Sequence, residues 1–466
     1  MTDPTARDEE ADIVARHGDW VQLRLTGFVG GVAATQLVCR PDRPSRVLSS
    51  VPAPEGRSLI PRGGGQGRGD AALNDGGAVL LTGRLDRMLS FDPADGVLVA
   101  EAGVTVGDIL RTFLPRAHAL AVCPANPATT LGGAIASDLH GNNHVRAGSF
   151  GDHVAWLDLV TPRGGLRRVS REEEPHLLEA TVGGMGLTGI IVRAALRLAP
   201  VASAFVAVRH LAVGSLDALV EQLESAAHAH DHATAWIDTL AGGLAEGRGV
   251  LETADIATAE KQAWRPMRAA APPVRPAILA RVLPRRLILR ASAERRYRRA
   301  KTGTAARIVP LDRLLFQPEV LAAWRGLYGG RGCTQFQCAV PLDGAAAAIR
   351  RLLDLTRRGG GAIGATVRAM GRQGRGMLTF ARPGVNLALD LRAGVATVEL
   401  MHRLERETLD RGGRVLPASD AHLTDHGFAA MYPRLDEFRA VLARIDPEMR
   451  MQSDLARRLR LRDYVV

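Results

Sequence analysis

The chain carries a dense glycine cluster, Arg62-Gly63-Gly64-Gly65-Gln66-Gly67-Arg68-Gly69-Asp70, between two apolar segments. Residues 57–61 lead into the cluster and residues 77–82 follow it, and both segments have the pattern of buried strands. Closely spaced glycines let backbone N–H groups approach a pyrophosphate without obstruction by side chains. The cluster therefore predicts a strand–loop–strand unit that binds a dinucleotide. A flexible surface turn is the alternative interpretation.

The context of this loop excludes two common nucleotide-binding motifs. Residues 67–72 have the glycine spacing of a Rossmann fingerprint, but a strand follows them where that motif requires a helix. A phosphate-binding P-loop needs a lysine directly after its glycines, and this loop has none. The loop therefore predicts a dinucleotide site of another architecture.

Length and composition indicate a globular protein with more than one domain. The chain has 466 residues, of which 46% are hydrophobic and 23% are charged. It contains no apolar run near the roughly 20 residues that span a membrane, and its first residues are acidic. We therefore expect a cytoplasmic protein. The four cysteines are widely scattered, which favours reduced thiols, and no cluster of His, Cys, Asp and Glu has the spacing of metal ligands.

The net charge of +11 comes almost entirely from arginine, because Lys261 and Lys301 are the only lysines. Prolines between residues 266 and 284 precede a dense group of arginines that ends at residue 301. This pattern predicts a mobile loop over residues 265–301, whose basic part, residues 281–301, acts as a lid against an anionic membrane or substrate. An ordinary solvated helix face is the alternative. A nucleic-acid partner is not expected, since Tyr297 is the only aromatic residue among these arginines.

Apolar periodicity predicts a mixture of helices and antiparallel strands. Residues 104–114 have helical spacing, with Thr105 as the N-cap. Residues 154–160 and 166–169, joined by a Pro-Arg-Gly-Gly turn, predict a hairpin. Longer amphipathic helices are predicted from about residue 200 onward, at residues 215–229 and 343–357. The sequence therefore predicts an α+β fold in which a second domain begins near residue 200.

Two further glycine-rich segments, residues 123–141 and 182–191, follow the first. In this order the three segments resemble the PCMH-type FAD-binding domain of the vanillyl-alcohol oxidase superfamily. From Leu25 to Leu461 the chain resembles, within that superfamily, the decaprenylphosphoryl-ribose oxidase family. The matching motifs are residues 25–27, 62–70, 132–136, 140–144, 147–151, 180–184, 235–238, 335–337, 431–438 and 453–459. The resemblance implies a two-part FAD-binding domain (1–199), a substrate domain with an antiparallel sheet (200–413) and a C-terminal segment (414–466) that returns to the FAD-binding domain.

The resemblance also implies roles for individual residues. It places FAD at Arg62, Gly63, Gly64, Gly65, Gln66, Gly67, Arg68, Asp70, Ala125, Thr130, Leu131, Gly132, Gly133, Ser137, His140, Asn143, Gly186 and Ile191. It places the catalytic groups at His140, Gln337, Asn386 and Arg368, and the substrate contacts at Trp236, Phe316, Ala388 and Ser419. Four positions depart from the family pattern: Arg68 and Phe316 replace tyrosines, Ser419 replaces a lysine and Ala388 replaces a cysteine. These departures indicate a changed substrate.

We therefore expect an enzyme that uses FAD to oxidise a hydroxyl of a sugar-type or phosphorylated substrate to a carbonyl, by hydride transfer to flavin N5. His140 suits the proton acceptor, because imidazole titrates near neutrality, and the charge of Arg368 suits electrostatic stabilisation. The FAD is expected to be non-covalent, since superfamily members that tether it from this loop use a histidine where Gln66 lies. The oxidation is expected as half of an epimerisation that a separate reductase completes, at the inner face of the membrane. The alternative is an oxidase or dehydrogenase of a soluble saccharide or nucleoside in an antibiotic-type pathway.

Overall fold

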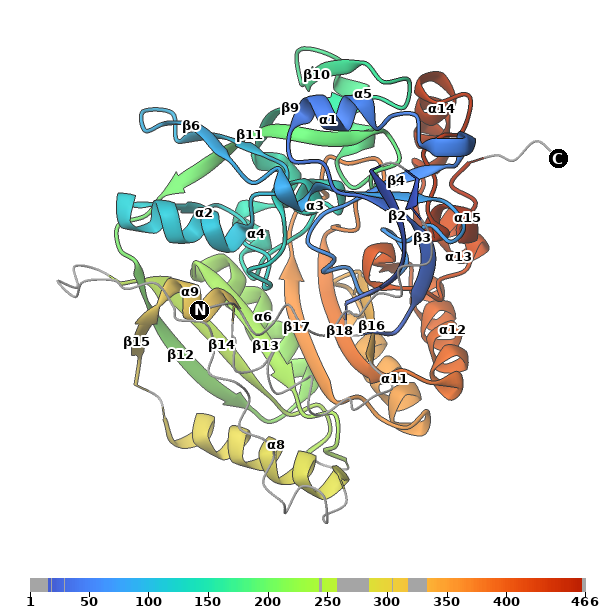
Figure 1. Ribbon diagram of the computed structural model, residues 1–466. Coiled ribbons are helices and arrows are strands. Elements are labelled where there is room, and N and C mark those ends of the chain that lie inside the picture. Colours follow the sequence, from blue (N-terminus) through green and yellow to red (C-terminus); the bar gives the residue numbers. More distant parts are fainter. Residues whose placement is uncertain are drawn as a thin grey trace.

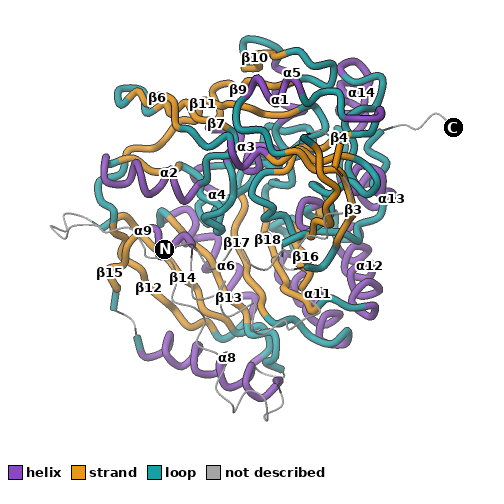
Figure 2. Tube along the Cα trace, in the orientation of Figure 1, coloured by secondary structure: helices purple, strands orange, loops and turns teal. Residues whose placement is uncertain are grey.

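The computed structural model describes residues 16–17, 19–28, 30–242, 245–257, 285–303, 305–316 and 333–462. It contains three β-sheets with helices packed around them, which confirms the α+β prediction (Figures 1 and 2). Within the described ranges, no helix has both the length and the apolar character needed to cross a membrane.

The first sheet carries the glycine cluster. Its strands are ordered β1-β2-β3-β5-β4, and β3 and β4 both run parallel to β5. Their bounds are β1 (Arg16–His17), β2 (Trp20–Thr26), β3 (Ala33–Cys39), β4 (Leu59–Arg62) and β5 (Ala78–Leu81). The cluster directly follows β4 and the chain re-enters the sheet at β5, so the predicted strand–loop–strand unit is confirmed.

The second sheet is antiparallel and packs beside the first. Its strands are ordered β10-β9-β11-β7-β6, and β8 also pairs with β11. The bounds are β6 (Met88–Asp92), β7 (Val97–Glu101), β8 (His118–Leu120), β9 (Val154–Val160), β10 (Leu166–Ser170) and β11 (Ile190–Pro200). The helices of this region are α1 (Pro44–Ser49), α2 (Val106–Phe113), α3 (Leu131–Ala136), α4 (His144–Ala147) and α5 (Pro175–Thr181). The β9–β10 hairpin confirms the predicted hairpin. Thr105 caps α2 as predicted, because its Oγ1 accepts a hydrogen bond from the Asp108 N–H.

The third sheet is antiparallel, with strand order β15-β12-β14-β13-β17-β18-β16-β19. The strands are β12 (Phe205–Val213), β13 (His232–Ile237), β14 (Gly249–Ile256), β15 (Arg307–Pro310), β16 (Cys333–Val340), β17 (Gly364–Met370), β18 (Gly384–Arg392) and β19 (Arg414–Val415). Helices α6 (Leu216–Ala229), α11 (Ala345–Arg358) and α12 (Val395–Asp410) pack against one face (Figure 1). Helix α9 (Leu311–Phe316) follows β15. The opposite face of the sheet is therefore open toward the rest of the molecule.

The C-terminal segment forms helices α13 (Asp425–Met431), α14 (Leu435–Ile445) and α15 (Asp454–Arg458). This segment contacts the first sheet, because Met451 forms a β-bridge with Leu59 and the Arg458 guanidinium pairs with Asp70 at 2.7 Å. Strand β19 extends the third sheet two residues past the predicted boundary at residue 413. The three-part division of the chain otherwise stays a prediction.

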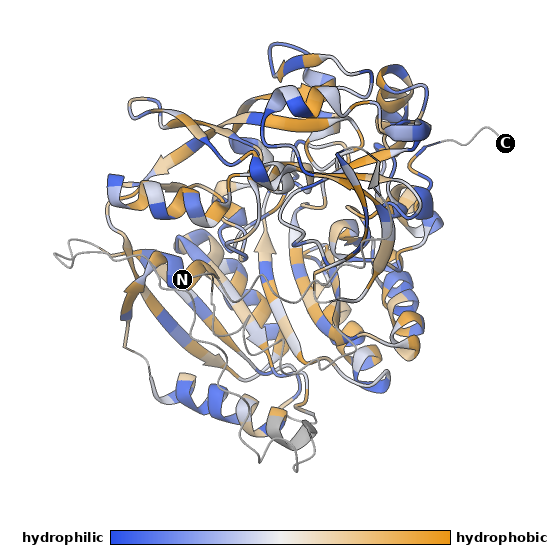
Figure 3. Cartoon of the chain, viewed as in Figure 1, coloured by the Kyte–Doolittle hydropathy of each residue, from blue (hydrophilic) through white to orange (hydrophobic). Residues whose placement is uncertain are grey.

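The expected mobile loop over residues 265–301 is wrong for its second half, which forms helix α8 (Arg285–Thr302) below β12, β13 and β14 (Figure 1). Residues 265–284 lie outside the described part of the chain. No proline follows Pro284 in this segment, and arginine, alanine and leucine all favour helix. Tertiary contacts add to this preference, since Arg248 pairs with Glu294 at 2.8 Å and lies 4.8 Å from the Tyr297 ring. Helix α8 is strongly hydrophilic (Figure 3).

Candidate cofactor and substrate site

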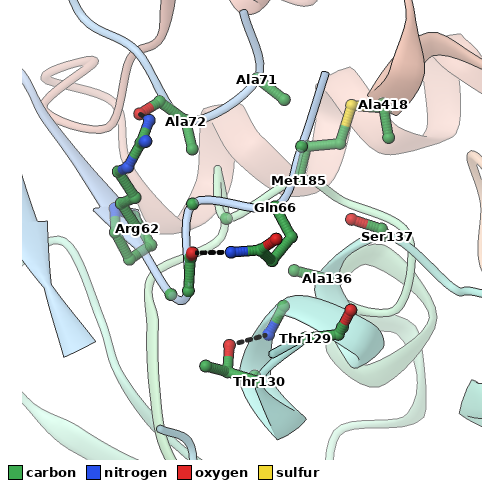
Figure 4. Close-up of a pocket in the computed structure, with 18 of the residues that line it drawn as sticks. Arg62, Gln66, Ala71, Ala72, Thr129, Thr130, Ala136, Ser137, Met185 and Ala418 are labelled. Atoms are coloured by element: carbon green, nitrogen blue, oxygen red, sulfur yellow. Dashed lines mark hydrogen bonds between the residues drawn. The ribbon is translucent and has the colours of Figure 1, made fainter. Parts of the chain in front are cut away.

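A cavity of about 190 Å³ lies where the first two sheets meet the C-terminal segment. The glycine cluster forms one wall, residues 129–139 form another, and Met185, Ala418 and Ser419 close it (Figure 4). Twelve predicted cofactor residues line this cavity: Arg62, Gly63, Gly64, Gly65, Gln66, Gly67, Thr130, Gly132, Gly133, Ser137, Gly186 and Ile191. Residues far apart in sequence therefore converge on one cavity.

The glycines are required because the walls approach closely. A Cβ on Gly63 would lie 2.1 Å from Thr130 Oγ1, and a Cβ on Gly64 would lie 2.3 Å from the Ala128 carbonyl oxygen. Both distances are shorter than any van der Waals contact, so side chains are excluded at these positions. A wall without side chains lets a ligand approach the backbone, which fits the phosphates of a dinucleotide.

Hydrogen bonds hold the glycine loop in place. Arg62 Nη2 donates to the Thr26 carbonyl oxygen at 2.7 Å. Gln66 Nε2 donates to the Gly64 carbonyl oxygen at 2.6 Å, as drawn in Figure 4, and Gln66 Oε1 accepts from Asn126 Nδ2 at 2.6 Å. Both ends of the Gln66 amide are therefore engaged in positioning the loop.

The structure places the remaining predicted cofactor residues outside the lining of the cavity. These are Arg68, Asp70, Ala125, Leu131, His140 and Asn143. Asp70 pairs with Arg458, Leu131 is fully buried in the core, and Asn143 Nδ2 donates to the Ala121 carbonyl oxygen at 2.8 Å. Ala125 is exposed.

Sequence reasoning also missed residues that do line the cavity, among them Thr82, Thr129, Met185 and Ala418. The first three lie in the segments 77–82, 123–141 and 182–191, which the sequence already marked as strand or glycine-rich. Their neighbours could therefore have indicated that they line the cavity. Ala418 reaches the cavity from the far end of the chain, and only its position next to Ser419 pointed to it.

A chain of hydrogen bonds joins three of the four predicted catalytic residues. Asn386 Nδ2 donates to the Cys338 carbonyl oxygen at 3.4 Å, which turns Asn386 Oδ1 toward Gln337. Gln337 Nε2 lies 3.4 Å from that oxygen and 3.0 Å from His140 Nε2. Because Gln337 Nε2 can only donate, His140 Nε2 accepts with its lone pair and the ring proton is on Nδ1. The chain of donors therefore selects the tautomer of His140.

His140 is a neutral base in this environment. Burial lowers the pKa of its imidazole well below the ordinary value, and the charge of Arg368 and the nearby His144 add to this effect. Phe380 packs against the ring with centroids 5.6 Å apart. The imidazole is thus deprotonated at neutral pH and available to receive a proton.

Arg368 lies directly opposite Asn386 in the β17–β18 register, on the open face of the third sheet. Its Nε donates to Asn142 Oδ1 at 2.6 Å, and burial lowers its pKa. In the same region Arg68 Nη1 pairs with Asp390 Oδ1 at 2.9 Å, and Gln335 Nε2 donates to the same oxygen at 2.9 Å. Arg68 therefore links the glycine loop to the third sheet.

The predicted substrate residues lie in three different places. The cross-strand register aligns Gln337, Ala388, Thr366 and Trp236 in one row across β16, β18, β17 and β13, so Ala388 and Trp236 share the open face with the catalytic residues. The Arg296 guanidinium of α8 lies 4.9 Å from the Trp236 ring. Ser419 lines the cofactor cavity, whereas the Phe316 side chain is buried in the hydrophobic core.

Comparison with known proteins agrees with this geometry. Residues 35–170 match the FAD binding domain family. Together with the glycine-lined cavity and the neighbouring polar face, this match defines an FAD-dependent oxidoreductase that acts on alcohol groups. The chain is 31% identical to decaprenylphosphoryl-β-D-ribose oxidase of Mycolicibacterium smegmatis, over 92% of this chain and 95% of the relative. It therefore belongs to the decaprenylphosphoryl-β-D-ribose oxidase family.

Two other relatives extend the comparison. An uncharacterized protein of Streptomyces coelicolor is 34% identical over 77% of this chain and 100% of its own length. D-Arabinono-1,4-lactone oxidase of Eremothecium gossypii is 29% identical over 36% of this chain and 32% of its own length. The second match covers about a third of each chain.

Proposed function

We propose that the protein oxidises a hydroxyl of a sugar-type substrate to a carbonyl. The observation that carries this proposal is the bonded set of Asn386, Gln337 and His140 on the open face of the third sheet, with Arg368 beside it. Bound FAD would supply the hydride acceptor, flavin N5, and the glycine loop would hold its phosphates. Relatives named for a ribose and for sugar lactones support a sugar-type substrate.

In this proposal His140 receives the hydroxyl proton. Its Nε2 lone pair now accepts from the Gln337 amide, so a substrate hydroxyl that displaces this amide meets the same lone pair. A low imidazole pKa keeps the base form available, although it also weakens the driving force for proton transfer. The fixed positive charge of Arg368 stabilises the alkoxide that develops as the proton leaves.

The remaining parts of the proposal concern the reaction pathway and the domain organisation of the chain. A separate nicotinamide-dependent reductase would return the carbonyl to a hydroxyl of opposite configuration and so complete an epimerisation. The alternative is oxidation of a soluble saccharide or nucleoside, which is supported by the departures at Arg68, Phe316, Ala388 and Ser419. We propose the FAD-binding domain as residues 1–199, completed by residues 414–466, and the substrate domain as residues 200–413.

We propose that FAD is held non-covalently, since the Gln66 amide is not a nucleophile and both its ends are bonded. Acid precipitation of the holoprotein should then leave the yellow colour in the supernatant. A yellow pellet would contradict this part of the proposal.

Helix α8 supports a contact with the anionic inner face of a membrane. Its exposed cations are Arg290, Arg295, Arg296, Arg298, Arg299 and Lys301. Its one carboxylate, Glu294, is paired with Arg248 and Arg298. This surface therefore carries an excess of positive charge.

The decisive experiment is anaerobic reduction of the bound flavin by a panel of polyprenyl-phosphate sugars, free saccharides and nucleosides. Bleaching of the flavin absorbance by a sugar of either kind supports sugar oxidation, and the preferred member separates the two substrate classes. An unchanged spectrum with every sugar and nucleoside would refute the proposed function.

A further inference from the structure

The Arg368 guanidinium is a charge without a carboxylate partner in the described part of the chain. Among the described residues, its hydrogen-bond partner is Asn142, whose Oδ1 accepts from Arg368 Nε. Asn142 is itself fixed, because its carbonyl oxygen accepts from the Ala233 N–H at 3.1 Å. The guanidinium is thus held by one edge, and the four N–H bonds of Nη1 and Nη2 make no hydrogen bond to a described residue.

The carboxylate that acts on Arg368 electrostatically, that of Asp390, is already engaged. Asp390 raises the pKa of Arg368 through space, but its Oδ1 accepts from both Arg68 and Gln335. The Arg68 and Asp390 side chains are 13% and 5% exposed, so this pair is a buried ion pair of zero net charge. The second cation, Arg368, remains uncompensated.

Nearby histidines do not change this balance. Burial lowers the pKa of His140 well below its ordinary value and that of His144 to about 4, so both rings are neutral at pH 7. The charged groups in the electrostatic surroundings of Arg368 therefore sum to one positive charge. A partly buried cation without a counter-ion is unfavourable, and an anion bound beside it removes that cost.

We propose that Arg368 binds a carboxylate of the substrate, so that the substrate is a sugar acid rather than a neutral sugar. The planar guanidinium presents two Nη groups side by side, which matches the two oxygens of a carboxylate. Because Arg368 lies opposite Asn386 in the strand register and Gln337 links Asn386 to His140, a carboxylate on Arg368 would lie near the hydroxyl whose proton His140 receives. This inference names the substrate class of the site and rests on the proposed sugar oxidation.

The test is equilibrium binding to the oxidised holoenzyme, in which no turnover occurs. D-Gluconate and D-glucitol are the probes, because they differ only in a carboxylate and a hydroxymethyl group. Each is titrated at constant ionic strength, and the change in flavin absorbance is recorded. We expect saturable binding of gluconate at least about tenfold tighter than that of glucitol, since a charge-assisted bidentate bond supplies this difference. Equal affinities would overturn the proposal.

Variants separate recognition of the carboxylate from other roles of the guanidinium. Arg368→Gln should weaken gluconate binding about tenfold to a hundredfold, and glucitol binding by a much smaller factor. Arg368→Lys keeps the positive charge but lacks the planar guanidinium with its two Nη groups. Its affinity for gluconate should therefore lie between those of the wild type and Arg368→Gln. The control is Arg392→Gln, at the exposed end of β18, which should bind gluconate like the wild type. FAD content and Tm identify a variant that fails to fold, in which case the probe comparison on the wild type decides.

Three results would overturn the inference. Wild-type gluconate affinity in Arg368→Gln, with only a shifted flavin reduction potential, would assign the charge to the reduced flavin. Inorganic phosphate that binds tighter than gluconate, through Arg368, would assign it to a phosphorylated substrate. Flavin reduction by neutral sugars without gluconate binding would refute the inference while the proposed oxidation stands. Gluconate binding through Arg368 in an enzyme that no sugar reduces would support the carboxylate site and refute the oxidation.

Discussion

The glycine loop allows a sharp test of cofactor binding through Gly64→Ala. The added Cβ would lie 2.3 Å from the Ala128 carbonyl oxygen, and a backbone atom cannot rotate away as a side chain can. The loop must therefore move by about 1 Å, and strain of this kind costs about 1–3 kcal/mol. Without FAD the loop can relax, so the cost falls on the FAD-bound conformation. We expect the affinity for FAD to fall about 5- to 150-fold.

The measurement is reconstitution of the apoprotein, followed by quenching of FAD fluorescence. The matched control is Gly83→Ala, because its Cβ would meet nothing within 4 Å and its neighbour Thr82 lines the same cavity. The control should bind FAD within about twofold of the wild type and have an unchanged Tm. Wild-type affinity and full FAD content in Gly64→Ala would refute the close approach of the loop to Ala128.

The remaining predictions concern the catalytic base, the cavity wall and helix α8. His140→Ala should slow flavin reduction about 10²-fold with unchanged FAD content, which stopped-flow absorbance measures. In the wild type the acid limb of this rate should lie below pH 6.5, because a lowered pKa keeps the imidazole neutral to lower pH. Ser419→Lys should slow the native reaction, since an ammonium at the cavity wall is desolvated. Binding to anionic vesicles should weaken with salt, and more so after joint Gln substitution of the α8 arginines 295, 298 and 299.

Each of these predictions has a clear contrary result. Unaltered flavin reduction in His140→Ala, or an acid limb above pH 6.5, would remove His140 as the base. Faster native turnover in Ser419→Lys would indicate a substrate close to that of the family. Equal binding to neutral and anionic vesicles would exclude an electrostatic role of α8, and a matched control is Arg350→Gln on α11, which lies elsewhere on the surface.

Local features were predictable from the sequence where local interactions determine them. The Thr105 cap, the β9–β10 hairpin and the strand–loop–strand unit each depend on residues within a short span. Helix α8 was expected only as the alternative to a mobile loop, because a run of arginines resembles a solvated loop. Its contacts with Arg248 depend on the loop that precedes β14, which is distant in sequence.

The site illustrates the same limit. The resemblance indicated His140, Gln337 and Asn386, and the structure joins them by hydrogen bonds. The resemblance also indicated Arg68 as a cofactor contact. In the structure the Arg68 side chain pairs with Asp390, 322 residues away in the sequence. Asp390 could have been found, since the period of two along β18 places it on the same face as Asn386. The choice of its partner depends on the packing of the glycine loop against the third sheet.

The position of Ala418 and Ser419 in the cavity wall has a consequence for biosynthesis. Synthesis proceeds from the N-terminus, so the glycine loop leaves the ribosome about 350 residues before these two residues do. Arg458, which pairs with Asp70 of the glycine loop, is synthesised later still. A nascent chain therefore has an open-sided pocket, and tight uptake of FAD must wait until residues 418–458 have been synthesised. Chains stalled before residue 418 should retain little flavin, and loss of the last fifty residues should yield a colourless protein.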